Sequence, residues 1–164
     1  MKSLKERKIK TRRRVLLYTD GACRGNGSHA AQASIAVRIV DENGRELERF
    51  GQAIGLATNN QAEYRALIKG LELATKHTTG QVDCYSDSQL VVNQLNETWK
   101  VNKKLKPLWI RAAGMENDFD KVTYNHLRRT DPRIVAVDTI ANEALDEAGT
   151  NCTNSALTMQ NKAA

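Results

Sequence analysis

The sequence lacks long apolar segments and has few cysteines. In its 164 residues, no hydrophobic run approaches the roughly 18 residues needed to cross a membrane, and the N-terminus has no apolar segment of the signal-peptide type. The three cysteines, Cys23, Cys84 and Cys152, show neither the paired spacing of a disulfide framework nor that of a zinc site. We therefore expect reduced thiols, no membrane partner and a cytoplasmic location.

Positive charge is concentrated at the N-terminus. Lys and Arg number 25 against 19 Asp and Glu, a net charge of +6. Residues 1–14 alone carry eight Lys or Arg and one Glu, or +7 by side chains, so the rest of the chain sums to about −1. Such a run is either a solvated terminus or a flexible arm that contacts nucleic-acid phosphates. We predict a basic flexible arm over 1–14, a folded domain over 15–149 and a disordered tail over 150–164.

Apolar periodicity and turn signals predict an α/β domain. The patterns favour strands over 15–20, 33–40, 45–53, 82–85 and 121–127, and helices over 60–76, 88–95, 103–115 and 137–148. A Gly-rich turn is expected over 21–27, and a basic loop over 128–134. The order β-β-β-α-β-α-α-β-α predicts a mixed five-stranded sheet, three strands antiparallel and then two parallel, flanked by helices.

Four carboxylates lie near the ends of these predicted elements. Asp20 ends the first strand, Glu63 lies in the first turn of the first long helix, Asp87 follows the fourth strand, and Asp138 opens the last helix. A single acid at a helix start is usually a cap or a dipole partner. In an open α/β sheet, however, the carboxyl ends of parallel strands meet at one edge, where Asp20 and Asp87 would lie side by side.

A cluster of four carboxylates without basic partners indicates a metal site. The charges would repel one another strongly in a low dielectric, unless divalent cations neutralise them. Oxygen ligands favour Mg²⁺, or Mn²⁺ as a substitute, over zinc. Two such ions can activate a water and stabilise the leaving oxygen of an in-line phosphoryl displacement.

Four motifs, one around each acid, resemble those of type 1 ribonucleases H. They are YTDGACRGNG at 18–27, TNNQAEYRAL at 58–67, YSDSQLVV at 85–92 and VDTIANEA at 137–144. The resemblance covers roughly residues 15–148. It implies a ribonuclease H-like fold, with 15–149 as a catalytic domain that cleaves the RNA strand of RNA–DNA hybrids and leaves 3′-hydroxyl and 5′-phosphate ends. It also implies the catalytic residues and ligands of two Mg²⁺ ions: Asp20, Glu63, Asp87 and Asp138.

The resemblance implies substrate-binding residues as well. Thr58 would hold a phosphate of the DNA strand, whereas Asn26 and Asn59 would reach 2′-hydroxyls or base edges in the minor groove, with Asn60 in the same set. The alternative is that Thr58-Asn59-Asn60 is only a helix cap. We expect an RNA–DNA hybrid as the partner, a monomer and no obligate protein partner.

The chain departs from the family in three regions. After Asn26 it has GSHAA at 27–31 where many bacterial members have Pro-Gly-Pro, so a differently shaped loop is expected there. The long basic protrusion of many members is reduced to residues 99–106, either a small basic handle or a solvated helix start. The loop before Asp138 lacks the family's mobile histidine. His126 precedes this loop and is favoured as a structural partner over a proton shuttle, which leaves the loop arginines to approach the leaving group or a phosphate: Arg128, Arg129 and Arg133.

Two other functions stay open at this point. A nuclease of the wider superfamily that acts on DNA would keep the same fold and acids, although Asn26 and residues 58–60 favour ribose hydroxyls. A nucleic-acid-binding module with a decayed site is the second alternative. The presence of all four acids argues against decay.

Overall fold

The protein is described by a computed structural model that covers residues 12–25 and 31–162. Its five strands form one mixed sheet in the order β3-β2-β1-β4-β5. The β1–β2 and β2–β3 pairs are antiparallel, and the β1–β4 and β4–β5 pairs are parallel. The predicted mixed sheet is therefore confirmed. The strands are β1 (Val15–Arg24), β2 (Ala31–Asp41), β3 (Glu46–Ala57), β4 (Gln81–Ser86) and β5 (Lys121–His126).

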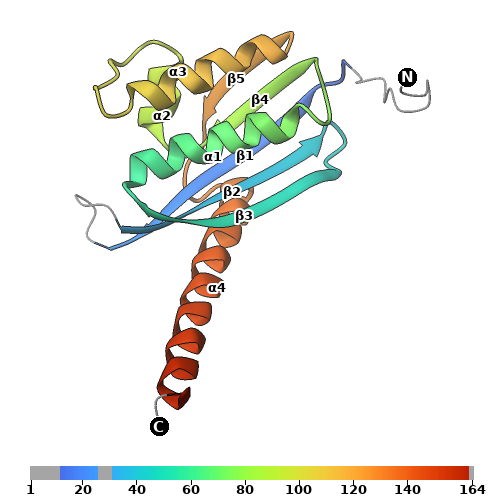
Figure 1. Ribbon diagram of the computed structural model, residues 1–164. Helices are drawn as coiled ribbons and strands as arrows, with labels where there is room; N and C mark the ends of the chain where they lie inside the picture. The colour runs from blue at the N-terminus through green and yellow to red at the C-terminus, as the bar shows by residue number, and fades with distance from the viewer. Residues whose placement is uncertain (1–11, 26–30, 163–164) are drawn as a thin grey trace, which may run out of the picture.

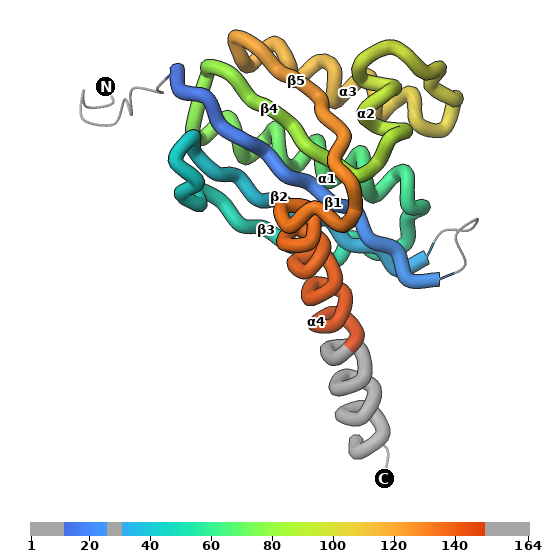
Figure 2. The backbone as a smooth tube through the Cα atoms, turned by 180° about the vertical axis from the view of Figure 1, so that it is seen from behind, coloured from blue at the N-terminus to red at the C-terminus, as the bar shows by residue number. Residues whose placement is uncertain are grey.

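Helices cover both faces of this sheet. Three α-helices and a 3-10 helix lie on one face, and α4 crosses the other face before it extends away from the sheet (Figure 1, Figure 2). None of the described helices is both long and apolar enough to cross a membrane. The helices are α1 (Asn59–Ala74), α2 (Gln89–Leu95), α3 (Lys106–Met115), η2 (Glu116–Asp118) and α4 (Pro132–Lys162).

The two faces of the central strands build two separate cores. Leu17 of β1 and Val37 of β2 pack with Leu71 of α1 in the larger core. Their chain neighbours, Tyr18 and Ala36, pack instead with the first half of α4. Successive strand residues point to opposite faces, so a strand buried on both sides needs apolar residues throughout. This requirement explains the nearly continuous apolar runs in β1 and β2.

Element boundaries differ from the sequence prediction in several places, and three of these differences bear on the site. β1 continues through the predicted turn at 21–27 as far as Arg24, because it stays paired with β2 up to Gln32. α4 begins at Pro132, inside the predicted basic loop, where Asp131 caps it by accepting the backbone N–H of Arg133. The helix then runs to Lys162 rather than ending near 148, with no proline after its first residue to stop it. The domain limits at 14/15 and 149/150 stay predictions.

Gly21 sets how closely β1 approaches α1. A Cβ atom built on Gly21 would lie 2.4 Å from the carbonyl carbon of Ala62 and 2.4 Å from the backbone nitrogen of Glu63. Both are backbone atoms of a buried helix, which cannot rotate out of the way as a side-chain tip can. The absent side chain therefore allows Asp20, the residue before Gly21, to lie against the first turn of α1.

We predict that Gly21→Ala destabilises the protein by about 1–3 kcal/mol, the usual cost of overpacking a tight interior contact. Gly114→Ala is the matched control, since nothing lies within 4 Å of a Cβ built on this α3 glycine. Alanine there should add up to about 1 kcal/mol of helix stability. Urea unfolding of both variants checks the prediction. Equal stability of Gly21→Ala and wild type would show that the packing of β1 against α1 does not require a residue without a side chain at this position.

Candidate functional site

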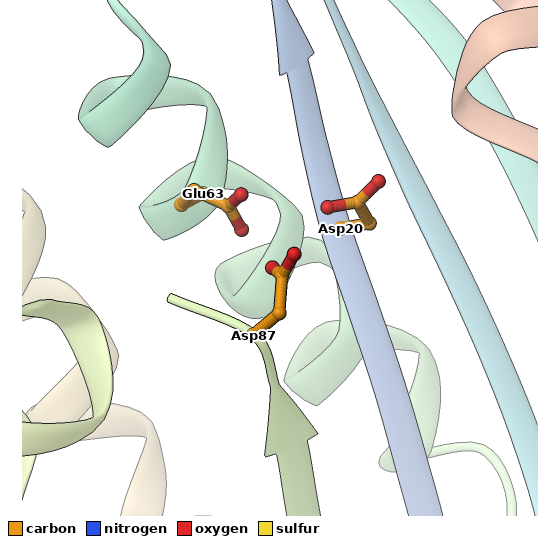
Figure 3. A group of neighbouring side chains, drawn as sticks. All are labelled: Asp20, Glu63 and Asp87. Atoms are coloured by element: carbon orange, nitrogen blue, oxygen red, sulfur yellow. The ribbon is translucent and has the colours of Figure 1, made fainter. Parts of the chain in front are cut away.

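Three carboxylates from separate elements converge at the edge where β4 ends. One oxygen each of Asp20, Glu63 and Asp87 lies within 4.8 Å of the others. Figure 3 shows the three side chains pointing toward one another from β1, α1 and the residue after β4. The register of the sheet explains two of them. The parallel β1–β4 ladder pairs Tyr18 with Tyr85, and each acid follows two residues later.

Asp138 joins this group from the other face of the sheet. It lies within α4, six residues after Pro132, rather than at the helix start that the sequence predicted, because α4 begins earlier. Asp138 is not one of the three residues whose carboxylate oxygens lie within 4.8 Å of one another. It is nevertheless close enough to Asp20 to hydrogen-bond and to affect its ionisation. The structure therefore brings all four sequence-predicted acids to one edge, three of them tightly.

Burial makes the ionised forms of these acids costly. Asp20 is 4% exposed and Glu63 is 5% exposed. Burial, hydrogen bonding to Asp138 and the charges of Asp87 and Asp138 raise the pKa of Asp20 to about 8. Burial and the charges of Asp20 and Asp87 raise the pKa of Glu63 well above its usual range. The folded protein therefore favours neutral acids here unless a cation compensates the charge.

The cluster fits a divalent cation. Among the described atoms, Asp20 Oδ2 and Glu63 Oε2 are buried without a hydrogen-bond partner. An oxygen-only donor set suits Mg²⁺ or Mn²⁺, and a cation would satisfy both orphaned oxygens at once. Arg129 approaches the cluster with its Nε 3.5 Å from Asp87 Oδ2, but its side chain is 86% exposed. A pair so open to water neutralises little of the buried charge.

A cleft beside the carboxylates is lined by residues from β1, α1, the loop after β5 and α4. Asn59 and Arg129 line it together with Asp138, the β1 residues Gly21, Ala22 and Cys23, and Asn142. Asn142 and Cys23 were not predicted from the sequence. Asn142 follows Asp138 by one helical turn and donates to its backbone oxygen at 3.0 Å. Helical spacing from Asp138 was therefore a signal that could have identified Asn142.

The predicted substrate-binding residues differ in how far they are exposed to the cleft. Asn59 is exposed in the cleft, and Asn60 is partly buried one residue further into α1. Thr58 forms a capping box, in which its Oγ1 accepts the Gln61 N–H at 3.2 Å and Gln61 Oε1 accepts the Thr58 N–H at 3.0 Å. The cap interpretation thus holds for Thr58, whose hydroxyl proton is still free to donate. Asn26 lies outside the described residues.

His126 ends β5, as the sequence predicted for a strand position. It is paired in register with Ser86, the residue before Asp87, and its side chain is exposed. The strand therefore brings it near the edge that carries the acids without placing it in the cleft that Asn59 and Asp138 line.

Comparison with known proteins identifies relatives of the chain. The profile of a family described as "Reverse transcriptase-like" matches residues 18–144. A ribonuclease HI of Halobacterium salinarum is 41% identical over 137 residues, which are 82% of this chain and 66% of the relative. A ribonuclease H of Lachnoclostridium phytofermentans is 33% identical over 81% of this chain and 92% of its own length.

Solved structures agree with these matches. The crystal structure of LC11-RNase H1 in complex with RNA/DNA hybrid has a TM-score of 0.73 and 33% identity, covering 82% of this chain and 98% of that one. Some relatives are longer than the matched region. The match spans 36% of a bifunctional protein of Mycobacterium tuberculosis, which is 37% identical over 82% of this chain.

We predict a pH-dependent stabilisation of the metal-free protein by Asp20→Asn. Because the pKa of Asp20 rises from 3.8 to about 8 on folding, the folded state holds the extra proton, and stability falls as pH rises between these values. Asparagine removes this cost. In EDTA, the variant should melt several degrees above wild type at pH 8.5, and the gap should close toward pH 4.

Asp118→Asn, which changes an exposed acid in η2, is the control and should produce no pH-dependent gap. Thermal melts across this pH range provide the measurement. A wild-type protein that is as stable as Asp20→Asn at pH 8.5 would contradict the electrostatic account of the cluster.

Proposed function

Because the chain belongs to the ribonuclease H family, we propose that it is an endonuclease that hydrolyses the RNA strand of RNA–DNA hybrids. The observation that carries the proposal is the buried group of Asp20, Glu63 and Asp87, with Asp138 beside it. The relatives of Halobacterium salinarum and Lachnoclostridium phytofermentans are named ribonucleases H, and LC11-RNase H1 has been solved with an RNA/DNA hybrid. We further expect a cytoplasmic monomer.

The four acids would hold two divalent ions, Mg²⁺ or Mn²⁺. Such ions, when bound, neutralise the carboxylates, activate the attacking water and stabilise the leaving oxygen of an in-line displacement. The chain contributes the geometry: β1, β4, α1 and α4 hold four acids that would otherwise repel one another. Water adds to phosphorus and the bond to the 3′-oxygen breaks. The products are then a 3′-hydroxyl and a 5′-phosphate.

The N-terminal turn of α1 supports a substrate that contains ribose. Asn59 projects into the cleft beside Asp138, and an amide can both donate to and accept from a 2′-hydroxyl. Thr58 and Asn60 flank it, with Thr58 able to donate its hydroxyl proton to a phosphate. Asn26 would complete this set from the segment after β1. This arrangement favours a hybrid over duplex DNA.

We predict that the wild-type chain with Mg²⁺ cuts the RNA strand of a labelled hybrid much faster than either double-stranded DNA or double-stranded RNA. Asp87→Asn should lower kcat by at least about 10²-fold, the scale of losing one electrostatic contact to the transition state. Asp118→Asn is the control and should cleave like wild type. Cleavage of duplex DNA alone would point to a DNA nuclease of the same fold, and binding without any cleavage to a binding module.

The leaving 3′-oxygen needs a proton or a positive charge, and either His126 or an arginine near the site would supply it. A general acid usually contributes 10²–10⁴-fold. His126 lies at the end of a strand, so we predict that His126→Ala lowers kcat by less than about tenfold and removes no limb of the pH–rate profile. Among Arg128, Arg129 and Arg133, only Arg129 forms an ion pair with the carboxylate cluster in the described part of the chain. We expect a larger kcat defect in Arg129→Ala.

Single-turnover cleavage of the hybrid measures both variants. Arginine stays protonated near neutral pH, so Arg129 could stabilise the negative charge on the leaving oxygen but could not supply its proton. A loss above 10²-fold in His126→Ala, with Arg129→Ala unaffected, would assign the proton transfer to His126 instead.

A further inference from the structure

Behind the carboxylates, two tyrosines connect the strands that carry Asp20 and Asp87. Tyr18 of β1 and Tyr85 of β4 are paired in the parallel ladder. Their rings stack with centroids 5.2 Å apart and planes inclined by 23°. This offset stacking lies within the range in which aromatic pairs attract each other beyond simple burial. The contact therefore ties the two strands together two residues before each acid.

Arg133 of α4 joins this pair. Its Cζ lies 5.8 Å from the centroid of the Tyr85 ring, within the range of a cation–π contact. The guanidinium also interacts with the hydroxyl of Tyr18. Arg133 precedes Asp138 by five residues on the same helix, so it ties the element that carries the fourth acid to both strands.

Asp131 fixes the orientation of this arginine. The Nε and Nη2 atoms of Arg133 donate to the two carboxylate oxygens of Asp131 at 2.9 and 2.8 Å. The backbone N–H of Arg133 donates to Asp131 as well, at 2.9 Å, so the same carboxylate caps α4. The Arg133 side chain is 47% exposed, and an ion pair this open adds little stability. Its bidentate geometry does fix the direction of the guanidinium.

These contacts act on the elements that the charge cluster pushes apart. Asp20 and Asp87 repel each other, and Asp20 is also affected by Asp138. Tyr18, Tyr85 and Arg133 join the same three elements on the side of the sheet opposite α1. Asp20 and Asp87 each follow the tyrosine of their strand by two residues, and Asp138 follows Arg133 by five. A shift of one strand or of α4 would therefore change the distances between acids directly.

We propose that Tyr18, Tyr85, Arg133 and Asp131 form a positioning clamp that sets the spacing of Asp20, Asp87 and Asp138, and thereby the affinity of the site for divalent cations. The inference rests on the proposed metal-dependent function. The clamp residues are positioning residues, since they act on the reaction only through the carboxylates. Residues that orient metal ligands typically change metal affinity or activity by 10–100-fold when they are replaced.

A purely structural role makes a different prediction. Arg133→Leu would then lower the melting temperature and leave the Mg²⁺ dependence unchanged. A positioning role raises the Mg²⁺ concentration needed for half-saturation. Both quantities can be measured without substrate, by titrating the full chain with MgCl₂ and following the rise in melting temperature. The kcat and KM of hybrid cleavage, measured across the same Mg²⁺ range, give a second readout.

We expect Arg133→Leu and Tyr85→Leu to raise the half-saturating Mg²⁺ concentration by roughly tenfold or more. KM for the hybrid should change by less than about threefold, because the clamp does not line the substrate cleft. Tyr85→Phe keeps the ring and should recover most of the affinity that Tyr85→Leu loses. Arg49→Leu is the matched control and should bind Mg²⁺ like wild type. It removes an arginine of similar exposure that is held by Glu46 at 2.7 Å on β3.

Unchanged half-saturation in both leucine variants would overturn the clamp, whatever happens to their melting temperatures. If neither variant folds, Arg133→Lys gives the same test, because it keeps the charge and loses the bidentate fork. The measurements on the wild-type protein test the proposed function separately. A wild type that binds Mg²⁺ without cutting hybrids would overturn that function, while the comparison of affinities still decides the clamp. A wild type without any Mg²⁺ response would overturn both proposals.

Discussion

Asp20 and Glu63 lie together with almost no access to water, and each holds one carboxylate oxygen without a partner among the described atoms. Burial and neighbouring charges raise both pKa values, so the folded chain resists the ionised state that a metal site requires. A bound cation that neutralises the acids offsets the free-energy cost of burying their charges. The surrounding fold must therefore keep β1, α1, β4 and α4 in place against this repulsion.

Two kinds of contact meet that requirement from opposite faces of the sheet. On one face, the missing side chain of Gly21 lets β1 lie against the backbone of α1 at Glu63. On the other, Val137 and Ile140 of α4 pack with Tyr18 and position the helix that carries Asp138. β1 belongs to both contacts because its residues alternate between the faces. Asp20 thus lies on the strand that is constrained from both sides.

The sequence predicted the sheet and the four acids because both leave local signals. Apolar runs and turn residues mark strands, and the carboxyl ends of parallel strands coincide wherever the chain crosses over. The limit of β1 left no such signal, whereas Asp131 followed by Pro132 is a helix-start signal that the sequence prediction overlooked. β1 extends through Gly21 because β2 pairs with it, and α4 starts early because Asp131 caps it. The contact between Arg133 and Tyr85 joins residues far apart in the chain, so periodicity could not show it.

The segment from β5 into the first turn of α4 shows how contact partners decide the role of a side chain. Arg129 and Arg133 are four residues apart and chemically identical, and the sequence alone gave no reason to separate them. Arg133 is held by both oxygens of Asp131 and lies over Tyr85, so its guanidinium has a fixed direction. Arg129 has one exposed contact with Asp87, which a bound cation would weaken by competing for the same carboxylate. Under the proposed function, Arg129 would then turn toward a substrate phosphate, while Arg133 stays in contact with Asp131 and Tyr85.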